Sequence, residues 1–194
     1  LLGPGAGTDA LEHALAAESM AHLASTVFAL DRRTEAEELC NEALAIRRRV
    51  LGANDPAVAA SLVDLARLAH ARGDREAAER LYREGLDIRT RALGRMHPDS
   101  VETLHGLAGL MYRNGHYDES ERLYQDVLSM YRTIYGEEDT HVAACLNEIA
   151  ILYAHTERYD DAEPMAREAL QINLKRIGPE HARIASDLNA LGSI

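Results

Sequence analysis

Apolar and polar residues along this chain recur with a fixed spacing of 42 residues. One apolar column contains Leu23, Leu65, Leu107, Ile149 and Leu191, and the residue after each is small: Ala24, Ala66, Ala108, Ala150 and Gly192. Three further columns of mostly small or apolar residues keep the same spacing: Ala36, Ala78, Ser120 and Ala162; Cys40, Tyr82, Tyr124 and Ala166; and Ala43, Gly85, Val127 and Ala169. A period that holds without slipping is typical of a repeat protein, in which each repeat packs on its neighbours.

Within each repeat, the apolar residues have helical spacing. In the second repeat they fall at Leu62, Leu65, Ala66 and Ala69, and then at Ala78, Leu81, Leu86 and Ile88. No stretch alternates with the period of two that is typical of a strand. Each repeat therefore predicts two helices joined by a short turn, with small residues where the helices approach closely.

A glycine follows the predicted second helix of each of the four repeats: Gly52, Gly94, Gly136 and Gly178. Glycine adopts the backbone conformations that end a helix at little cost. Pro56 and Pro98 stand where the following helix begins, a position that tolerates a missing backbone N–H. We therefore expect each second helix to stop at its glycine, so that the chain turns back and starts the next repeat.

These patterns predict an all-α solenoid with about four full repeats and a final half repeat. We expect residues 1–8 to be a linker or an expression remnant, and residues 9–194 to form one repeat array. The predicted repeats cover residues 9–55, 56–97, 98–139 and 140–181, and residues 182–194 begin a fifth.

Composition and charge narrow the classes of partner. The formal net charge is −11, from 32 acidic and 21 basic residues, which argues against a nucleic-acid surface because such a surface needs clustered Lys and Arg. No apolar run approaches the roughly 20 residues needed to cross a bilayer, so we expect a cytoplasmic protein without a membrane partner. Cys40 and Cys145 form no CxxC arrangement, and we expect both to be small buried thiols.

The sequence offers no convincing catalytic or cofactor site. The segment GPGAGT at residues 3–8 has glycine-rich spacing, but no strand precedes it and no lysine follows, as a phosphate-binding loop requires. No HExxH, GxSxG or CxxC motif occurs. We therefore expect a chain that is not an enzyme and that holds no cofactor or metal.

The repeats resemble a known family. The segments SLVDLARLAHARGDREAAERLYREGLDIRTRALG, TLHGLAGLMYRNGHYDESERLYQDVLSMYRTIYG and CLNEIAILYAHTERYDDAEPMAREALQINLKRIG resemble the tetratricopeptide repeat (TPR), and the 42-residue spacing is similar to that of kinesin light chains. The resemblance covers about residues 9–194, although the first repeat lacks glycine in its inner turn. Kinesin light chains carry recurrent asparagines on the inner helix. Only Asn147 and Asn189 match those positions here, so no ligand preference is carried over.

The resemblance implies a right-handed superhelix whose first helices line a concave groove. It places the following residues in that groove: His22, Phe28, Val63, Asp64, Arg67, His70, His105, Tyr112, Arg113, Asn147, Glu148, Ile151, His155 and Asn189. Aromatic, histidine and arginine groups beside carboxylates suit an extended or helical peptide. The four histidines come from separate repeats, about 8–10 Å apart. That separation does not favour joint metal ligation, which needs bonds of about 2.0–2.1 Å.

Two functional classes fit these features. The first is a noncatalytic interaction module, a scaffold or adaptor that binds a peptide or a partner domain in the groove. The second is a regulatory sensor domain that binds a signal peptide or a small ligand and controls an attached effector domain.

The C-terminal segment ARIASDLNALGSI continues the apolar pattern of a first helix, at Ile184, Leu188, Leu191 and Ile194. Solenoids usually end in a capping element with a polar outer face, which this segment lacks. We expect either that the array continues in a longer protein, or that this open end is covered by a second copy of the chain in a homodimer.

Overall fold

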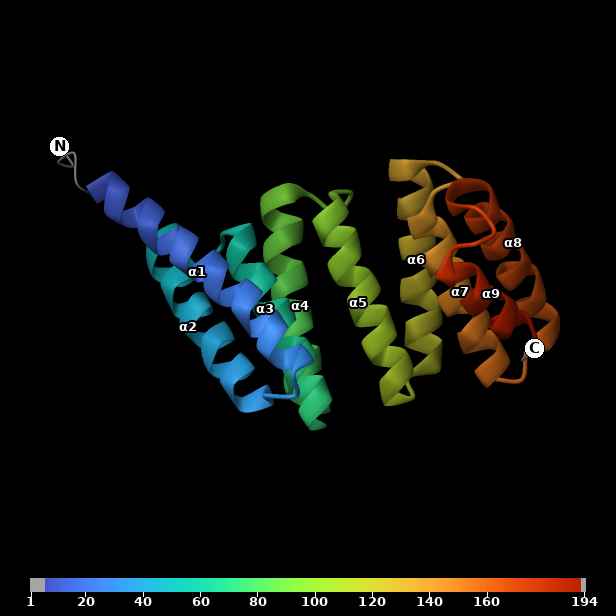
Figure 1. Cartoon of the computed structure of the whole chain (residues 1–194), viewed down its shortest axis with the longest axis horizontal. Helices are drawn as coiled ribbons and strands as arrows, with labels where there is room; N and C mark the ends of the chain where they lie inside the picture. The colour runs from blue at the N-terminus through green and yellow to red at the C-terminus, as the bar shows by residue number, and fades with distance from the viewer. Residues whose placement is uncertain (1–5, 193–194) are drawn as a thin grey trace. The chain divides into compact units, whose positions relative to one another are not determined.

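This computed structural model describes residues 6–192, except for the side chains of residues 6–11, Ser186, Asn189 and Ala190. Within that range the chain forms nine helices and no strand (Figure 1). They are α1 (Ala6–Ala29), α2 (Arg33–Leu51), α3 (Pro56–Arg72), α4 (Arg75–Leu93), α5 (Pro98–Asn114), α6 (Tyr117–Tyr135), α7 (Thr140–His155), α8 (Tyr159–Ile177) and α9 (Ala182–Gly192). The prediction of an all-α chain with two helices per repeat is confirmed.

The first helix begins before residue 9, where we expected the repeat array to start. Because α1 begins at Ala6, residues 6–8, which we assigned to the linker, are helical. Residues 1–5 of that predicted linker lie outside the described residues.

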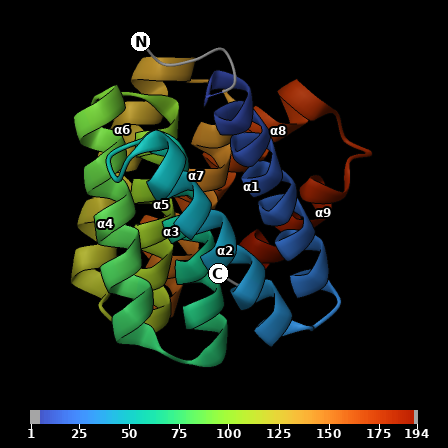
Figure 2. The same cartoon turned by 90° about the vertical axis from the view of Figure 1, so that its left-hand side faces the viewer.

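The chain divides into two compact units, residues 1–103 and residues 104–194, and the boundary between them falls within α5. In the N-terminal unit, α1 packs on α2, α2 on α3 and α3 on α4 (Figure 2). In the C-terminal unit, α6 packs on α7, α7 on α8, and both α7 and α8 on α9. Within each unit these helices thus pack mainly on their neighbours in sequence, as expected of repeats.

The outer and inner turns of the repeats use different backbone conformations. The glycines that end the second helices have φ between 77° and 93° and ψ between 156° and 169°. That region is essentially restricted to glycine. The inner turns have positive φ at positions 42 residues apart: Asp31 (59°), Gly73 (89°), Gly115 (85°) and Glu157 (61°). Residues other than glycine can adopt the left-handed conformation at moderate cost, so the inner turn tolerates Asp or Glu.

The starts of the first helices follow the expected capping chemistry. The carboxylate of Asp55 accepts a hydrogen bond of 2.8 Å from the backbone N–H of Ala57, and Pro56 is the first residue of α3. Asp139 caps α7 in the same way, accepting from the N–H of His141 at 2.9 Å. These caps satisfy backbone donors that a helix start leaves without partners.

The small residues predicted at close helix contacts are buried. Ala24, Ala66, Ala108 and Ala150 are all inaccessible to solvent, and so are the residues of the column that begins with Ala36. The buried free thiols of Cys40 and Cys145 also confirm the prediction.

Leu23 is the exception in the apolar columns. It is 50% exposed, whereas its equivalent Leu65 is 7% exposed. Leu65 belongs to a core cluster with Cys40 and Leu44 of the preceding helix α2. No described helix precedes α1, so the same face of α1 has nothing in the described chain to pack against.

Hydrogen bonds join the second helix of one repeat to the first helix of the next at equivalent positions. Arg47 Nη1 donates to Ser61 Oγ at 2.7 Å, and Arg89 Nη1 donates to Thr103 Oγ1 at 2.7 Å. Further along the chain, Asn173 Nδ2 donates to the buried carboxylate of Asp187, also at 2.7 Å. These polar contacts fix the register between consecutive repeats, because a buried polar group is costly without its partner.

Within the described residues, no helix combines the length and the apolar character that a membrane span requires.

Candidate interaction surface

In the N-terminal unit, four of the predicted groove residues meet around two adjoining cavities. The larger cavity, of about 270 Å³, is bordered by Phe28, Asp64 and Arg67. The smaller one, of about 90 Å³, is bordered by Val63 together with Asp64 and Arg67. The residues come from α1 and α3, the first helices of their repeats.

The other predictions for this unit have different outcomes. The side chain of His22 is 81% exposed, and its Nε2 lies 4.0 Å from the carboxylate of Glu18 on the same helix. Val63 is 6% exposed and packs against the backbone of Gly85, so it is mainly a core residue that touches the edge of the smaller cavity. His70 is half-buried and borders neither cavity.

Asp64 and Arg67, which border both cavities, form an ion pair whose pKa values depend on burial and on neighbouring charges. Arg67 Nη1 lies 3.5 Å from Asp64 Oδ1 on the same helix. Burial raises the pKa of the Asp64 carboxyl, although Arg67, Arg47 and Arg89 act in the opposite direction. Burial also opposes the charge of Arg67, but its hydrogen bond with Tyr82 and the nearby Asp64 carboxylate raise its pKa overall. The pair therefore places a carboxyl group and a guanidinium group side by side at the cavity wall.

In the C-terminal unit, His105 and Glu148 form the centre of a polar cluster. His105 Nε2 lies 2.9 Å from Glu148 Oε2, and His105 Nδ1 lies 3.2 Å from the hydroxyl of Tyr131. Burial alone would raise the pKa of Glu148. Hydrogen bonds from His105 and from the Tyr124 hydroxyl, with the positive charge of Arg113, lower it below its ordinary value. Glu148 is therefore held as a carboxylate with its acceptor sites in use.

A second cluster in this unit consists of aromatic side chains. Tyr112, Tyr117 and His155 lie with ring centroids 5.2–5.9 Å apart, and the hydroxyl of Tyr117 is 2.8 Å from His155 Nε2. Such separations are favourable for aromatic pairs. On the same helix as His155, Ile151 is 45% exposed and adds an apolar side chain to the surface.

Asn147 takes part in a third contact, which is structural. Its Nδ2 donates to Asp187 Oδ1 at 2.5 Å, while Asn173 Nδ2 donates to the other oxygen of the same carboxylate. The side chain of Asn189, the last predicted groove residue, lies outside the described residues.

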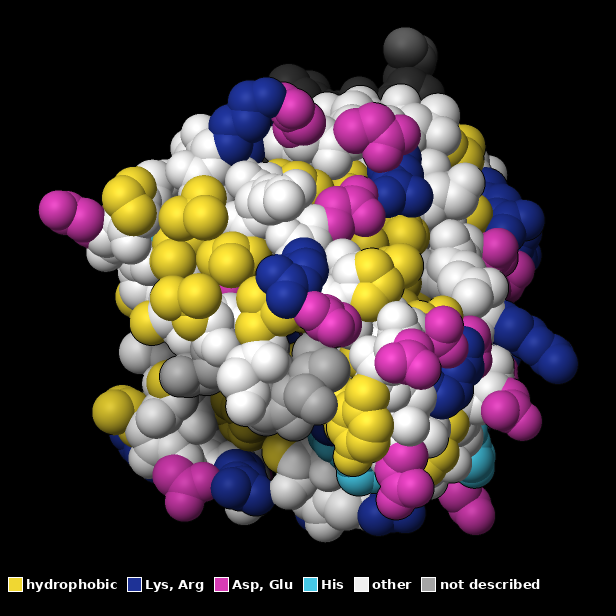
Figure 3. All heavy atoms as spheres, turned by 90° about the vertical axis from the view of Figure 1, so that its right-hand side faces the viewer, with side chains coloured by type: hydrophobic (Ala, Val, Ile, Leu, Met, Phe, Trp, Pro, Cys, Tyr) yellow, Lys and Arg dark blue, Asp and Glu magenta, His cyan; other side chains and the backbone are white. Residues whose placement is uncertain are grey.

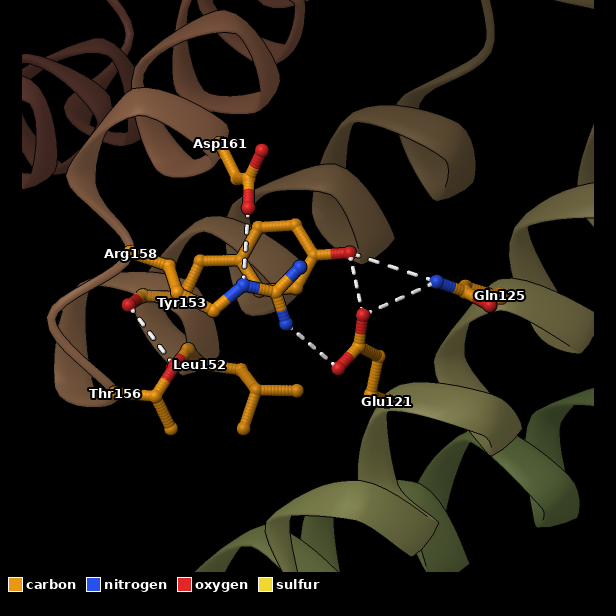
Figure 4. A network of polar contacts seen from close by, with 7 residues as sticks. All are labelled: Glu121, Gln125, Leu152, Tyr153, Thr156, Arg158 and Asp161. Carbon is orange, nitrogen blue, oxygen red and sulfur yellow. Dashed lines mark hydrogen bonds and ion pairs between the residues drawn. The ribbon is translucent and has the colours of Figure 1, made fainter.

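Next to His155, a network of polar contacts joins α6, α7 and the turn that leads to α8 (Figure 4). Arg158 donates to Glu121 at 2.8 Å and to Asp161 at 2.9 Å, and its guanidinium carbon lies 4.1 Å from the centre of the Tyr153 ring. The Tyr153 hydroxyl donates to Glu121 at 3.0 Å. This network ties the turn that follows His155 to α6 and α8.

The sequence prediction missed the contribution of tyrosines on the second helices. Tyr82 and Tyr124 belong to a column that we interpreted as packing, and both are indeed buried. Their hydroxyls nevertheless reach the predicted groove residues Arg67 and Glu148. The sequence did contain a signal for these contacts, because tyrosine occurs twice in a column that is otherwise small or apolar. A buried tyrosine hydroxyl usually has a hydrogen-bond partner, so a polar contact could have been expected there.

One face of the molecule mixes charges of both signs. Figure 3 shows Lys or Arg side chains lying next to acidic ones on that face, with hydrophobic side chains between them. Among the described residues, no group of three or more His, Cys, Asp or Glu side chains has the arrangement of a metal site.

Comparison with known proteins identifies the repeats. The tetratricopeptide repeat family matches residues 13–91, 76–133 and 99–175 of the chain. Among solved structures, BtubC (BKLC) from P. vanneervenii is similar over 97% of this chain and 75% of its own, with a TM-score of 0.85 and 22% identity. A kinesin light chain-like protein from P. anserina, with nearly identical TPR-like repeats, is similar over 90% of this chain and 82% of its own, with a TM-score of 0.76 and 25% identity. None of the curated proteins matches the sequence.

The fold thus defines a helical repeat protein that presents side chains of its first helices around cavities and polar clusters. The chain belongs to the tetratricopeptide repeat family, and its repeats are of the kinesin light chain-like type. TPR folds generally serve as scaffolds for protein interactions, which is the class of function that the family indicates here.

Proposed function

We propose that this chain is a noncatalytic scaffold or adaptor that binds a peptide or a partner domain through the groove side of its first helices. The main support is that residues which the family resemblance assigns to the groove lie together within each unit. Phe28, Asp64 and Arg67 border one cavity, and His105 contacts Glu148 directly.

The chemistry of these clusters suits a polypeptide ligand. Tyr112 and His155 offer aromatic faces and Ile151 offers an apolar contact. Arg113, which follows Tyr112 in sequence and acts on the Glu148 carboxylate, offers a cation. Aromatic and arginine residues are the most common energetic centres of protein interfaces. A peptide can use such groups for its side chains and the neighbouring polar groups for its backbone.

The test starts with a partner captured by the intact chain from its native cells and identified by mass spectrometry. Binding of the purified partner is then measured by calorimetry with the chain and with Tyr112→Ala and Arg113→Ala. Each substitution should weaken binding by about 2 kcal/mol, typical of a central interface residue. Circular dichroism should show that both variants remain folded.

Glu76→Ala and Arg122→Ala are the matched controls, because both residues are exposed on second helices. They should leave the affinity unchanged. Equal losses from both pairs would place the partner on another surface and contradict the proposal.

The sensor alternative makes a separate prediction. A sensor must bind its ligand differently in two conformations, so binding should change the radius of gyration measured by X-ray scattering. The adaptor that we propose should bind without such a change. A large change on binding would favour the sensor.

We also propose that α9 contributes to a homodimer contact. Leu188 on this helix is 54% exposed, and Leu174 on the neighbouring α8 is exposed as well. Light scattering should then show a dimer that depends on concentration, and Leu188→Glu should abolish it. A strictly monomeric chain at high concentration would contradict this contact.

A further inference from the structure

The larger cavity of the N-terminal unit coincides with a change in the repeat pattern. At the position occupied by Tyr82 in the second repeat and Tyr124 in the third, the first repeat has Cys40. All three side chains are buried on the second helix of their repeat. A thiol is much smaller than a phenol ring, so the first repeat lacks the large side chain that the second and third repeats carry here. The fourth repeat has the small residue Ala166 at this position.

Tyr82 and Tyr124 show what a tyrosine ring at this position contacts in the second and third repeats. The hydroxyl of Tyr124 hydrogen-bonds with Glu148, and it lies 3.3 Å from where a Cβ on Gly109 would be. The hydroxyl of Tyr82 hydrogen-bonds with Arg67. In both cases the ring is buried against the first helices, and its hydroxyl hydrogen-bonds with a charged residue of a first helix, Arg67 or Glu148.

In the first repeat, that space is an open cavity of about 270 Å³. Its walls are apolar at Ala24, Phe28, Cys40 and Leu68, and charged at Asp64 and Arg67. Asp64 follows Cys40 by 24 residues, as Glu148 follows Tyr124 by 24. Asp64 therefore occupies the place of the carboxylate that accepts a tyrosine hydroxyl in the C-terminal unit.

We propose that this cavity binds the side chain of a tyrosine supplied by a protein partner, which takes the place of the ring that the first repeat lacks. The phenol ring lies between Phe28 and Leu68, and its hydroxyl donates to the Asp64 carboxylate and accepts from Arg67. The proposal rests on the proposed function and specifies the chemistry of one part of the partner.

The size and the charges of the cavity select this occupant over others. An apolar cavity of about 150 Å³ is enough to bind benzene, so the space here accommodates a substituted ring. A purely apolar side chain would cover the Asp64 carboxylate without giving it a donor, which is costly. An acidic side chain would meet Asp64, and a basic one would meet Arg67, so either charge is repelled by one member of the pair.

Two properties of the lining residues agree with noncovalent binding. Burial, with the nearby Asp64 carboxylate, raises the pKa of the Cys40 thiol to about 11, so the thiol stays protonated and unreactive at neutral pH. Burial also raises the pKa of Asp64, which a hydrogen-bond donor from a ligand would offset.

The experiment uses p-cresol, the side-chain analogue of tyrosine, and toluene, which differs only by the hydroxyl. Both are titrated into the intact chain and followed by NMR. We expect p-cresol to bind about tenfold more tightly than toluene, the factor expected for one hydrogen bond. Nuclear Overhauser effects should connect its ring protons to the side chains of Phe28 and Leu68. Equal affinities, or contacts to other residues only, would overturn the proposal.

Three variants test the site itself. Cys40→Tyr should fill the cavity, raise the melting temperature and abolish p-cresol binding, while Cys40→Ala should retain binding. Asp64→Asn should reduce the preference for p-cresol over toluene. Unchanged p-cresol binding in a folded Cys40→Tyr variant would overturn the assignment. If Cys40→Tyr does not fold, the Overhauser contacts in the unmodified chain decide the question.

Failure of the tyrosine pocket can be distinguished from failure of the proposed function. Loss of partner binding in Tyr112→Ala and Arg113→Ala, without any p-cresol binding at Cys40, would leave the adaptor function standing and reject the tyrosine pocket alone.

Discussion

His105 Nε2 and Glu148 Oε2 lie 2.9 Å apart, although the residues are 43 positions apart in sequence. They stand on the first helices α5 and α7, and Tyr124 from α6 completes the hydrogen bonds to the same carboxylate. This contact holds two repeats together through an ionised group.

The first prediction concerns the pH dependence of this contact. The pKa of Glu148 is lowered in the folded chain. Its stabilising contribution is therefore complete above the unfolded pKa of about 4.3, and it is lost as the pH falls through the lower folded value. Glu148→Gln should lower the free energy of unfolding at pH 7, and the difference from the unmodified chain should shrink near pH 3. Denaturant titrations at both pH values measure it, with Glu76→Gln as the control. A difference that does not depend on pH would contradict the prediction.

A second prediction tests helix packing at Ala108. Ala108 is fully buried, and its carbonyl oxygen accepts a hydrogen bond of 2.9 Å from Ser120 Oγ on α6. Ala108→Leu should overpack this contact and lower the free energy of unfolding by about 1–3 kcal/mol. Ala45→Leu, at an exposed position of α2, should change it by less than about 0.5 kcal/mol. Thermal unfolding of both variants gives the comparison, and an unchanged Ala108→Leu variant would show that the helices do not approach closely there.

The third prediction compares the outer turn at Gly94 with the inner turn at Gly73. Replacing glycine by alanine should lower the free energy of unfolding by different amounts at the two positions. A Cβ on Gly94 or on Gly73 would touch nothing within 4 Å, so only backbone strain differs between them. Gly94 has φ 93° and ψ 156°, whereas Gly73 has φ 89° and ψ 5°. Gly94→Ala should cost up to about 3 kcal/mol. Gly73→Ala should cost about 1 kcal/mol, because alanine can enter the left-handed region. Chemical denaturation measures both, and a larger loss for Gly73→Ala would refute this interpretation.

The last prediction concerns the buried carboxylate of Asp187. Its oxygens accept hydrogen bonds from Asn147 and Asn173. Asn173→Ala removes one donor and should destabilise the chain by about 1–3 kcal/mol. Hydrogen exchange should also become faster in α9, since this contact ties α9 to α8. Asn41→Ala removes an exposed amide that bonds only within its own helix, and it should have little effect. Equal exchange rates in the two variants would show that the contact does not hold α9.

The repeat length, the helices and the turns could be predicted from the sequence because they depend on local properties. Gly52, Gly94, Gly136 and Gly178 recur because the outer turn needs a conformation that other residues avoid. The small columns are visible for a similar reason, since close helix packing restricts side-chain size wherever it occurs. The assignment of residues to the groove came from the resemblance to the tetratricopeptide repeat.

What those residues contact was decided by the tertiary structure. The sequence alone does not show that Tyr124 reaches Glu148, that Val63 is buried in the core, or that Leu23 is exposed while Leu65 is covered. Nor does it show that the exchange of a tyrosine for Cys40 leaves an open cavity beside Asp64. Such contacts depend on the distance and angle between helices, which result from the packing of many side chains at once. A periodic pattern specifies which face a residue lies on, but only the packed helices bring two such residues to within a hydrogen bond.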